Sequence, residues 1–594
     1  MSKYTMLLNI LDQIRQEATP TNFKAKYVSG TTDPDQINYE RARAFIHLYL
    51  KVSFGLLDFI EREHFVTDGA YDGGIDGYFI DSENRKIYLI QSKFRTTEEN
   101  FSNKQMTLEE VLAMDANRII EGYEQDERGN AYNGKILGLQ REIRSIDDIA
   151  RYSYRVILLS NLAIPSGSKL SRVVGGLPCE VVDSEKCFEQ LVFPVISGTF
   201  FNASDLTIHL DLSNKNAGAK ISYTVDTRFG ECEITALFVP TIEIAKTFRK
   251  YKNSILKFNP RSYLELEGEK VNQAIRNTII QKGKNEFALY NNGITMLSNE
   301  THLNERIGQK NKAQLNVTNP QIINGGQTAY TLSRVYEEFK PEEAQAIFEG
   351  KEVLLKVITL NSGDYTSEKQ KANLIEAVSQ ATNLQTSVIA ADRYSNEPAN
   401  LELQKTLFDR YGLLYERKRG EFADGLHNGY IDRKQVVERN FFFRVLFAAN
   451  GDLGTAVQKR LFTKLSKSKW AMPGANELDR FYFAYLCFQL LEPTQTETDY
   501  RTKEIYAKLF VMTSWFIPSN PADFAAVAEK ALPSFVAEWD RFVKINESTN
   551  TKFIKMRYDP YTQQTVARFG RGKWVRSQSF LVDVKKYFET HLSN

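Results

Sequence analysis

The sequence predicts a multidomain α/β protein with a helical C-terminal region, and three observations support this fold class. The chain has 594 residues, which is too long for one hydrophobic core and suggests roughly three or four domains. Near the N-terminus, the apolar periodicity gives the order helix, hairpin, helix, strand, which is typical of a small α/β layer domain. Short apolar strands alternate with helical patterns again in the middle of the chain, and helical patterns dominate its last part.

These changes of pattern divide the chain into four expected regions. Residues 1–165 should form the first α/β domain, and residues 166–235 a strand-rich connecting region punctuated by glycine- and proline-containing turns. Residues 236–430 should form a second α/β domain, in which the strand 353–360 follows helical sequence. Residues 431–594 should form a mostly helical C-terminal domain with aromatic-rich helices.

The first domain has the clearest pattern of elements. Its apolar residues recur at helical spacing in two segments and alternate with polar residues in a hairpin with a polar turn. The expected elements, in order, are an amphipathic helix within residues 1–20, a long helix Asn38–Phe59, the hairpin strands Asp76–Ile80 and Lys86–Phe94, a helix Leu108–Tyr123 and a buried strand Tyr154–Ser160.

The overall composition says little about function but excludes several classes of protein. Hydrophobic residues at 42%, charged residues at 25% and a net charge of +2 are ordinary globular values, so any nucleic-acid-binding surface must be local. The four cysteines form no CxxC or CxxH pair, which argues against a zinc module and suits a reducing compartment. Walker A, kinase and GxSxG signatures are absent from the sequence, which disfavours a P-loop ATPase, a kinase and a serine hydrolase.

Targeting signals and membrane segments are also absent from the sequence. The N-terminal stretch has polar and acidic residues among its apolar ones and lacks the cleavage signature of a secretory signal. The most apolar later stretch, residues 441–449, is much shorter than a membrane-spanning helix. We therefore expect a cytoplasmic protein that does not enter a membrane.

A polar constellation at the predicted hairpin is the most informative feature of the chain. The sequence Asp72-Gly-Gly-Ile-Asp76-Gly is followed, fifteen residues after Asp76, by Gln91-Ser-Lys93. Because strand side chains alternate between faces, Gln91 and Lys93 share one face, and a hairpin partner that begins with Asp76 brings its carboxylate beside them. Such oxygen ligands suit Mg²⁺ or Mn²⁺, and a nearby lysine can orient a nucleophile and stabilise the transition state of phosphodiester hydrolysis.

This pattern resembles the PD-(D/E)XK superfamily, in particular its restriction-endonuclease-like branch with a GGIDG turn and a QxK strand. The resemblance implies a restriction-endonuclease-like α/β domain with Asp76, Gln91 and Lys93 in the active site and Mg²⁺ or Mn²⁺ as the cofactor. Gln91 departs from the usual acid, although its amide oxygen can still coordinate a cation. The metal site therefore needs another carboxylate.

Several acidic residues compete for this position. Glu40 is the candidate that the resemblance favours, because the superfamily often supplies a glutamate from a helix; we include it with Asp76 and Gln91 among the expected metal ligands. Asp72 and Glu61 are the alternatives. A purely structural interpretation also stands beside the catalytic one: Asp72 and Asp76 would cap glycine turns, and Lys93 would be a solvated strand residue.

Three polar loops stand out in the second α/β region, at residues 290–295, 323–328 and 381–386. They carry the candidate binding residues Asn292, Asn324, Gln327, Thr328, Asn383 and Gln385. A strand that runs into Asn-Gly-Gly-Gln-Thr and then into a helix would direct free backbone N–H groups at an anion such as phosphate. The same glycine-containing sequences are also what tight turns require, so each loop taken alone is more often a turn than a binding site.

The motifs NNGIT, INGGQT and TNLQT in these loops are similar to those of the AIPR family, named for abortive infection phage resistance. The resemblance covers about residues 240–430 and implies a bacterial antiphage role, often with an N-terminal nuclease domain. It does not identify the ligand of the loops.

Two basic stretches carry further candidates for phosphate contacts. Residues 459–469 hold basic side chains at helix-face spacing, and residues 552–576 interleave basic residues with Tyr558, Phe569 and Trp574. A solvated helix face and a core hairpin near the C-terminus explain these stretches at least as well.

Two functional hypotheses follow from the sequence. The first is a metal-dependent nuclease that hydrolyses DNA, with RNA left open, in antiphage defence; its partners would be nucleic acid and a nucleotide or phage-derived trigger, and a homodimer is left open. The second is a nucleotide- or nucleic-acid-binding sensor with a degenerate nuclease fold, motivated by Gln91 and the asparagine loops.

Overall fold

The structure is a computed structural model, and it divides into two compact units that are described separately. The first unit comprises residues 1–387 and 419–433, and the second comprises residues 388–418 and 434–594. The structure describes the chain except for residues 1, 83, 108–110, 112–113, 163–169, 171–173, 200–204, 213–219, 228–229, 257–258, 260–268, 282–284, 306, 361–373, 375–377, 379–397, 419, 459–460, 462–471, 492–498, 560–563 and 592–594.

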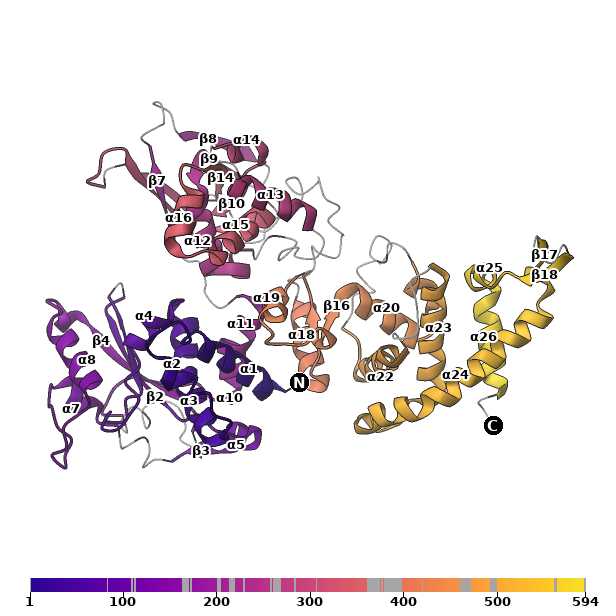
Figure 1. The fold of residues 1–594 in the computed structure, drawn as a ribbon, viewed down its shortest axis with the longest axis horizontal. Helices are drawn as coiled ribbons and strands as arrows, with labels where there is room; N and C mark the ends of the chain where they lie inside the picture. The colour runs from indigo at the N-terminus through magenta and orange to yellow at the C-terminus, as the bar shows by residue number, and fades with distance from the viewer. Residues whose placement is uncertain are drawn as a thin grey trace. The chain divides into compact units, whose positions relative to one another are not determined.

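The N-terminal part of the first unit is built on a four-stranded sheet with the order β1-β2-β4-β6 (Figure 1). The hairpin predicted from the alternating pattern is present: β1 (Gly77–Asp81) and β2 (Lys86–Ser92) pair antiparallel. On its other side β2 pairs in parallel with β4 (Ser153–Leu159), and β4 pairs with β6 (Cys179–Val181). The sheet therefore extends past residue 165, where the sequence pattern placed the end of this region.

Helices cover both faces of this sheet, because strand β2 is apolar on both sides. Ile87 and Leu89 pack in one cluster with apolar residues of α7 (Ala116–Ile120) and α8 (Gly134–Arg144). On the opposite face α3 (Pro34–Phe54) approaches so closely that a Cβ atom on Gly77 would lie 2.9 Å from Cγ2 of Ile46. The result is a layer of sheet between two layers of helix.

The N-terminal helices lie on the side of the sheet that α3 covers. The predicted amphipathic helix is α1 (Lys3–Gln16), which buries Met6, Leu7, Ile10, Leu11 and Ile14. The long helix expected to reach Phe59 ends earlier, because Gly55 adopts the left-handed conformation that terminates helices. Asp58 then caps a separate short helix, α4 (Phe59–His64), with its carboxylate accepting from the N–H of Glu61.

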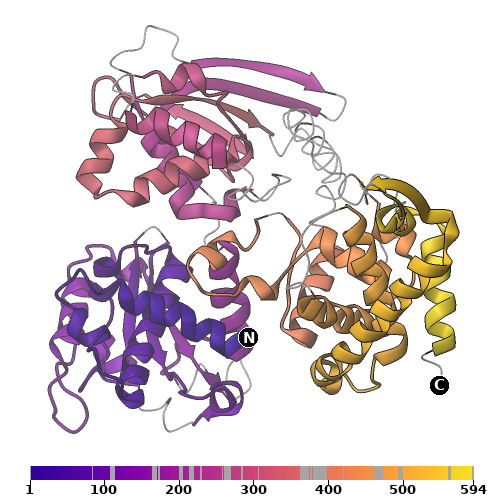
Figure 2. The ribbon, with the colours of Figure 1, turned by 45° about the vertical axis from the view of Figure 1, so that its right-hand side comes forward.

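The second part of the first unit contains a five-stranded sheet of order β13-β10-β14-β9-β8 and a three-stranded sheet of order β11-β12-β7. Figure 2 shows β8 and β9 running side by side as an antiparallel pair. The strands are β7 (Asp205–Asp211), β8 (Lys220–Thr227), β9 (Gly230–Pro240), β10 (Ile294–Ser298), β11 (Glu300–Asn304), β12 (Lys312–Thr318), β13 (Gln321–Asn324) and β14 (Glu352–Thr359).

The expected strand-rich connecting region contributes to these sheets. Its strand β7 pairs with β12, and β9 pairs with β14. Long-range pairing of this kind leaves no local signal in sequence, so the expected boundary near residue 235 falls inside β9. Two helices, α12 (Thr241–Tyr251) and α15 (Gly326–Glu338), pack on the same apolar cluster as these strands.

The second unit is mainly helical, as the sequence predicts. Its core is rich in aromatic side chains, among them the fully buried Phe442, Trp539 and Trp574. Its longer helices are α18 (Pro398–Tyr411), α20 (Arg439–Ala449), α22 (Ala475–Leu491), α23 (Asp499–Phe516), α24 (Phe524–Thr549) and α26 (Ser579–His591). In the part of the chain that the structure describes, every helix is too short or too polar to cross a membrane.

The predicted hairpin near the C-terminus is also present, as β17 (Ile554–Asp559) and β18 (Gln564–Phe569). Trp574 follows it in the short helix α25 (Arg571–Arg576) and is fully buried, with its ring 5.5 Å from that of Phe569. This burial removes Trp574 from the aromatic side chains that could stack on bases. The other basic stretch, residues 459–469, lies almost entirely outside the described residues.

Candidate metal centre

The loop between α4 and β1 is folded tightly by its own backbone. The N–H groups of Thr67 and Asp68 both donate to the carbonyl oxygen of Asp76, each at 3.0 Å, and Ile75 donates to the carbonyl of Asp72 at 3.2 Å. At the tip, Gly73 has a φ of +63°, and a Cβ atom there would lie 2.8 Å from Cδ1 of Ile119. Glycine meets both requirements, which explains the residue type at position 73 of the motif.

Asp76 lies where this loop enters the hairpin. Its N–H donates to the carbonyl of Ile90 at 2.8 Å, and its carboxylate oxygen Oδ2 accepts from the N–H of Ser92 at 2.6 Å. The carboxylate is therefore tied to the backbone of the strand that carries Gln91 and Lys93. This is the arrangement that the spacing of the motif predicts.

Asp72 has two roles in the same loop. Its carboxylate accepts from the N–H of Gly74 at 2.9 Å and from the N–H of Gly69 at 3.1 Å, so it caps the glycine turn as the structural interpretation expects. It also lies near Asp76, because its charge contributes to raising the pKa of that carboxyl group. Asp72 can therefore cap the glycine turn and also lie next to Asp76.

Three carboxylates converge at this point: each of Asp68, Asp72 and Asp76 offers an oxygen, and these oxygens lie within 4.8 Å of one another. Asp68 was missed by the sequence reasoning. A signal for it exists, because the three aspartates are spaced four residues apart and each precedes a glycine. An all-oxygen group of this kind fits the hard cations Mg²⁺ and Mn²⁺.

Burial and mutual repulsion make this group electrostatically strained. Burial raises the pKa of Asp76 to about 7, and the charges of Asp72 and Asp68 push it in the same direction. The Ser92 hydrogen bond and the charge of Lys93 oppose this rise. Burial also raises the pKa of Asp72. A cation placed among the three carboxylates would relieve their repulsion.

Gln91 lies on β2, and Lys93 directly follows the last residue of this strand. The N–H of Lys93 donates to the carbonyl of Leu159 on β4 at 3.1 Å, which fixes the backbone just beyond the end of β2. The positive charge of its ammonium group lowers the pKa of both Asp72 and Asp76 and so opposes the effect of burial. Gln91 is only 3% exposed.

Glu40 was expected to complete the metal site, and the structure gives its carboxylate other contacts. It is fully buried in α3, where Oε2 pairs with Arg15 of α1 and Oε1 accepts from the N–H of Ser29 at 3.1 Å. The group of three carboxylates does not include it. These contacts tie α1 to α3. The alternative Glu61 is an exposed residue in the first turn of α4.

Two of the three asparagine loops of the second part lie together. Nδ2 of Asn291 donates to Oγ1 of Thr328 at 3.1 Å, which joins the loops 290–295 and 323–328. The N–H of Gly325, whose φ is +82°, donates to Oδ1 of Asn324, and helix α15 begins directly afterwards. The bond between Asn324 and Gly325 is local and suits a tight turn. Gln327 is the second residue of α15 and Asn292 is exposed, whereas Asn383 and Gln385 lie outside the described residues.

The fold and the carboxylate group together define an α/β protein with a candidate divalent-metal centre at the start of a hairpin. Residues 256–460, called the AIPR region below, match the model of a known family that is described as AIPR protein. The match confirms the resemblance seen in the loops and extends past residue 430 into the helical unit. No curated protein and no solved structure matches the chain.

Proposed function

We propose that the N-terminal α/β part of this chain is a divalent-metal-dependent nuclease that hydrolyses phosphodiester bonds, with DNA as its substrate. The observation that carries the proposal is the convergence of Asp68, Asp72 and Asp76 at the start of the β1–β2 hairpin, where the charge of Lys93 also acts on Asp76. A carboxylate cluster with an adjacent ammonium group is the combination that the motif resemblance to PD-(D/E)XK nucleases implies. The parallel extension of the sheet through β4 and the helices on both faces support the same assignment.

Each residue has a role that its surroundings support. Asp68, Asp72 and Asp76 would hold the cation, and Asp76 is oriented by the N–H of Ser92. Bound Mg²⁺ would lower the pKa of a water molecule and neutralise negative charge on the phosphate. Lys93 would orient the attacking water and stabilise charge on the phosphate oxygens. Gln91, buried on the same strand, would contribute its amide oxygen or position the neighbouring groups.

The AIPR region supports a role in defence. The family takes its name from abortive infection phage resistance, and residues 256–460 match it. We therefore propose that the nuclease acts in bacterial antiphage defence and that the AIPR region recognises the target or restrains the active site. The nucleic-acid substrate is the partner that this proposal requires, and a nucleotide or phage-derived trigger would act on the AIPR region.

A cleavage assay tests the nuclease proposal directly. The full chain is incubated with plasmid DNA and with RNA, in Mg²⁺, in Mn²⁺ and in EDTA. We expect metal-dependent cleavage of DNA that Asp76→Asn abolishes. The matched control is Asp81→Asn, which changes the aspartate at the other end of β1. Equal products from wild type and Asp76→Asn with every substrate would contradict the proposal.

The alternative is a binding protein that retains the nuclease fold without turnover. The bond between Asn291 and Thr328, which brings two asparagine loops together, is the observation that favours it. Calorimetry with nucleotides and oligonucleotides would then show binding that Asn324→Ala weakens and Asp76→Asn leaves unchanged. Cleavage by the wild-type chain would exclude this alternative.

A further inference from the structure

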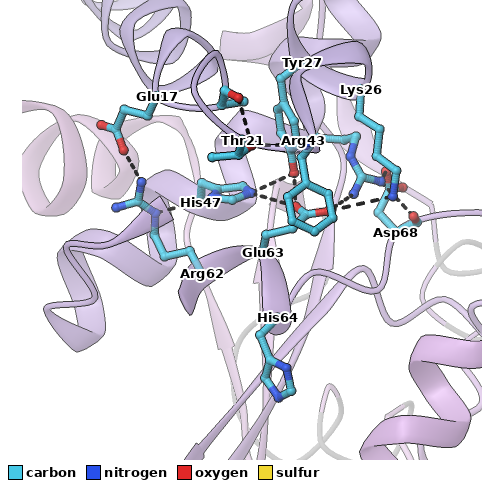
Figure 3. Close-up of polar contacts among 12 residues, drawn as sticks. Glu17, Thr21, Lys26, Tyr27, Arg43, His47, Arg62, Glu63, His64 and Asp68 are labelled. Carbon is cyan, nitrogen blue, oxygen red and sulfur yellow. Dashed lines mark hydrogen bonds and ion pairs between the residues drawn. The ribbon is translucent and has the colours of Figure 1, made fainter. Parts of the chain in front are cut away.

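A buried network of charged and polar side chains lies beside the carboxylate group. It consists of Glu17, Tyr27, Arg43, His47, Arg62 and Glu63 and ends at Asp68 (Figure 3). Arg62, His47 and Glu63 are fully buried, and Arg43 is only 4% exposed. Burying so many charges is costly, and apolar replacements of such groups are often neutral or stabilising. We therefore look for a role of the network other than stabilising the fold.

The far end of the network is anchored by Arg62. Its Nη1 donates to the carbonyls of Leu56 and Leu57 at 2.9 and 3.0 Å, and its Nη2 pairs with Glu17. Its Nε donates to Nδ1 of His47 at 3.3 Å. Because Nδ1 accepts this bond, the proton of the neutral imidazole lies on Nε2, which faces Glu63 at 3.2 Å.

Glu63 is the centre of the network. Its Oε2 accepts from Tyr27 and from His47, and its Oε1 lies 3.3 Å from Nη2 of Arg43. Burial favours protonation of this carboxyl, but the hydrogen bonds from His47 and Tyr27 and the charge of Arg43 outweigh it and lower the pKa. Glu63 is therefore a negatively charged residue that pairs with Nη2 of Arg43 and leaves Nη1 to contact Asp68.

Arg43 connects Glu63 to the candidate metal centre. Its Nη1 donates both to the backbone carbonyl of Asp68 at 2.8 Å and to the carboxylate Oδ2 of the same residue at 2.9 Å. Contacts to both the backbone and the side chain fix the rotation of the Asp68 carboxylate as well as its position. A carboxylate has two oxygens, so this contact is compatible with coordination of a cation by Oδ1.

We propose that Arg43 is a positioning residue, which orients Asp68 toward a divalent cation and is itself held by Glu63. This inference rests on the proposed metal centre. It adds Arg43 as the residue that orients the carboxylate of Asp68. Asp68 lies in a loop and is partly exposed, so it would otherwise adopt several rotamers and lose them on binding metal. The network removes this entropy cost before the metal arrives.

Calorimetric titration of the full chain with Mn²⁺ tests the proposal in a double-mutant cycle. Arg43→Lys keeps the charge but cannot bridge Glu63 and Asp68, and we expect about tenfold weaker binding, the usual effect of losing a residue that orients a metal ligand. Asp68→Asn should weaken binding at least as much. The double variant should bind like Asp68→Asn alone, because Arg43 acts through Asp68.

Two further variants serve as a matched control and as a replacement for a variant that does not fold. Arg41→Lys is the matched control, since Arg41 lies on the same helix and makes a comparable bidentate pair with Asp12; it should bind Mn²⁺ like wild type. If Arg43→Lys does not fold, as judged by circular dichroism, Glu63→Gln replaces it. That variant should weaken binding severalfold in the wild-type background and have no effect in the Asp68→Asn background.

The outcomes separate this inference from the function on which it rests. Absence of Mn²⁺ binding by wild type, or binding that survives Asp76→Asn, would overturn the metal centre and the positioning role together. If Asp76→Asn abolishes binding but Arg43→Lys and Glu63→Gln match wild type, the centre stands and the positioning role is wrong. The role is also wrong if the effect of Arg43→Lys persists in the Asp68→Asn background.

Discussion

The backbone N–H of Ser92 donates a hydrogen bond to Oδ2 of Asp76, with 2.6 Å between the two atoms. Ser92 is the last residue of β2 and stands between Gln91 and Lys93, so this bond joins the acidic loop to the segment that carries the other candidate residues. The bond ties the Asp76 side chain to the backbone of β2, and the three aspartates are candidate metal ligands. Substitutions of the polar side chains should therefore change metal binding and catalysis more than stability.

Asp76→Asn should abolish Mn²⁺ binding without lowering the stability of the metal-free protein. The substitution removes a buried charge that Asp72 and Asp68 repel, while the side-chain oxygen can still accept from Ser92. Thermal unfolding in EDTA should begin no earlier than in wild type. The stabilisation by metal, about 3 kcal/mol at a hundredfold excess over Kd, should disappear. A large loss of stability in EDTA would show that Asp76 is structural.

Lys93→Ala should reduce DNA cleavage by at least about a hundredfold, because a charge aimed at the transition state is lost. Metal binding should be retained or become slightly tighter, since a positive charge that acts on Asp72 and Asp76 is removed. Initial cleavage rates and Mn²⁺ titrations measure the two effects. Lys86→Ala, at the other end of the same strand, should match wild type in both. Equal losses of binding and cleavage in Lys93→Ala would contradict the assigned role.

Gly73→Ala should destabilise the loop by about 1–3 kcal/mol and weaken metal binding. A Cβ atom at this position meets Ile119 at 2.8 Å in addition to the cost of a φ of +63°. Gly129→Ala separates the two effects, because Gly129 has a φ of +82° with no atom within 4 Å of an added Cβ. Urea unfolding should show the larger loss for Gly73→Ala. Similar losses in both variants would mean that the contact with Ile119 is easily relieved.

The α3 layer should lose stability as pH falls from about 6.5 to 4. Burial lowers the pKa of His47 to about 4, although the hydrogen bond to Glu63 opposes this shift. Below pH 6.5 the unfolded chain takes up a proton at His47 that the folded chain does not, so protonation favours unfolding. The full effect is about 3 kcal/mol, reached near pH 4.

Hydrogen exchange of residues 34–54 across this pH range measures the effect in the helix that carries His47. His47→Gln should flatten the dependence between pH 4 and 6.5. His64→Gln removes an exposed histidine from the neighbouring helix and should leave it unchanged. An unaltered slope in His47→Gln would exclude His47 as its source.

Spacing and alternation within the sequence predicted much of the site. The hairpin follows from alternate apolar residues on β2, and the start of β1 then brings Asp76 to the end of β2, where its carboxylate accepts from the N–H of Ser92. The glycines around Asp72 predicted the turn, and the loop motifs predicted the AIPR region. These signals are local, because each depends on residues only a few positions apart or on one strand pair.

Tertiary structure alone decided which acids gather and how they are held. Glu40 and Asp68 are both acidic residues near the first domain's helices, but only the fold pairs Glu40 with Arg15 and places Asp68 against Arg43. Likewise, only the pairing of β7 and β9 with distant strands shows where the second α/β region begins. Contacts between residues far apart in the chain depend on packing of whole elements, which the pattern along one sequence does not record.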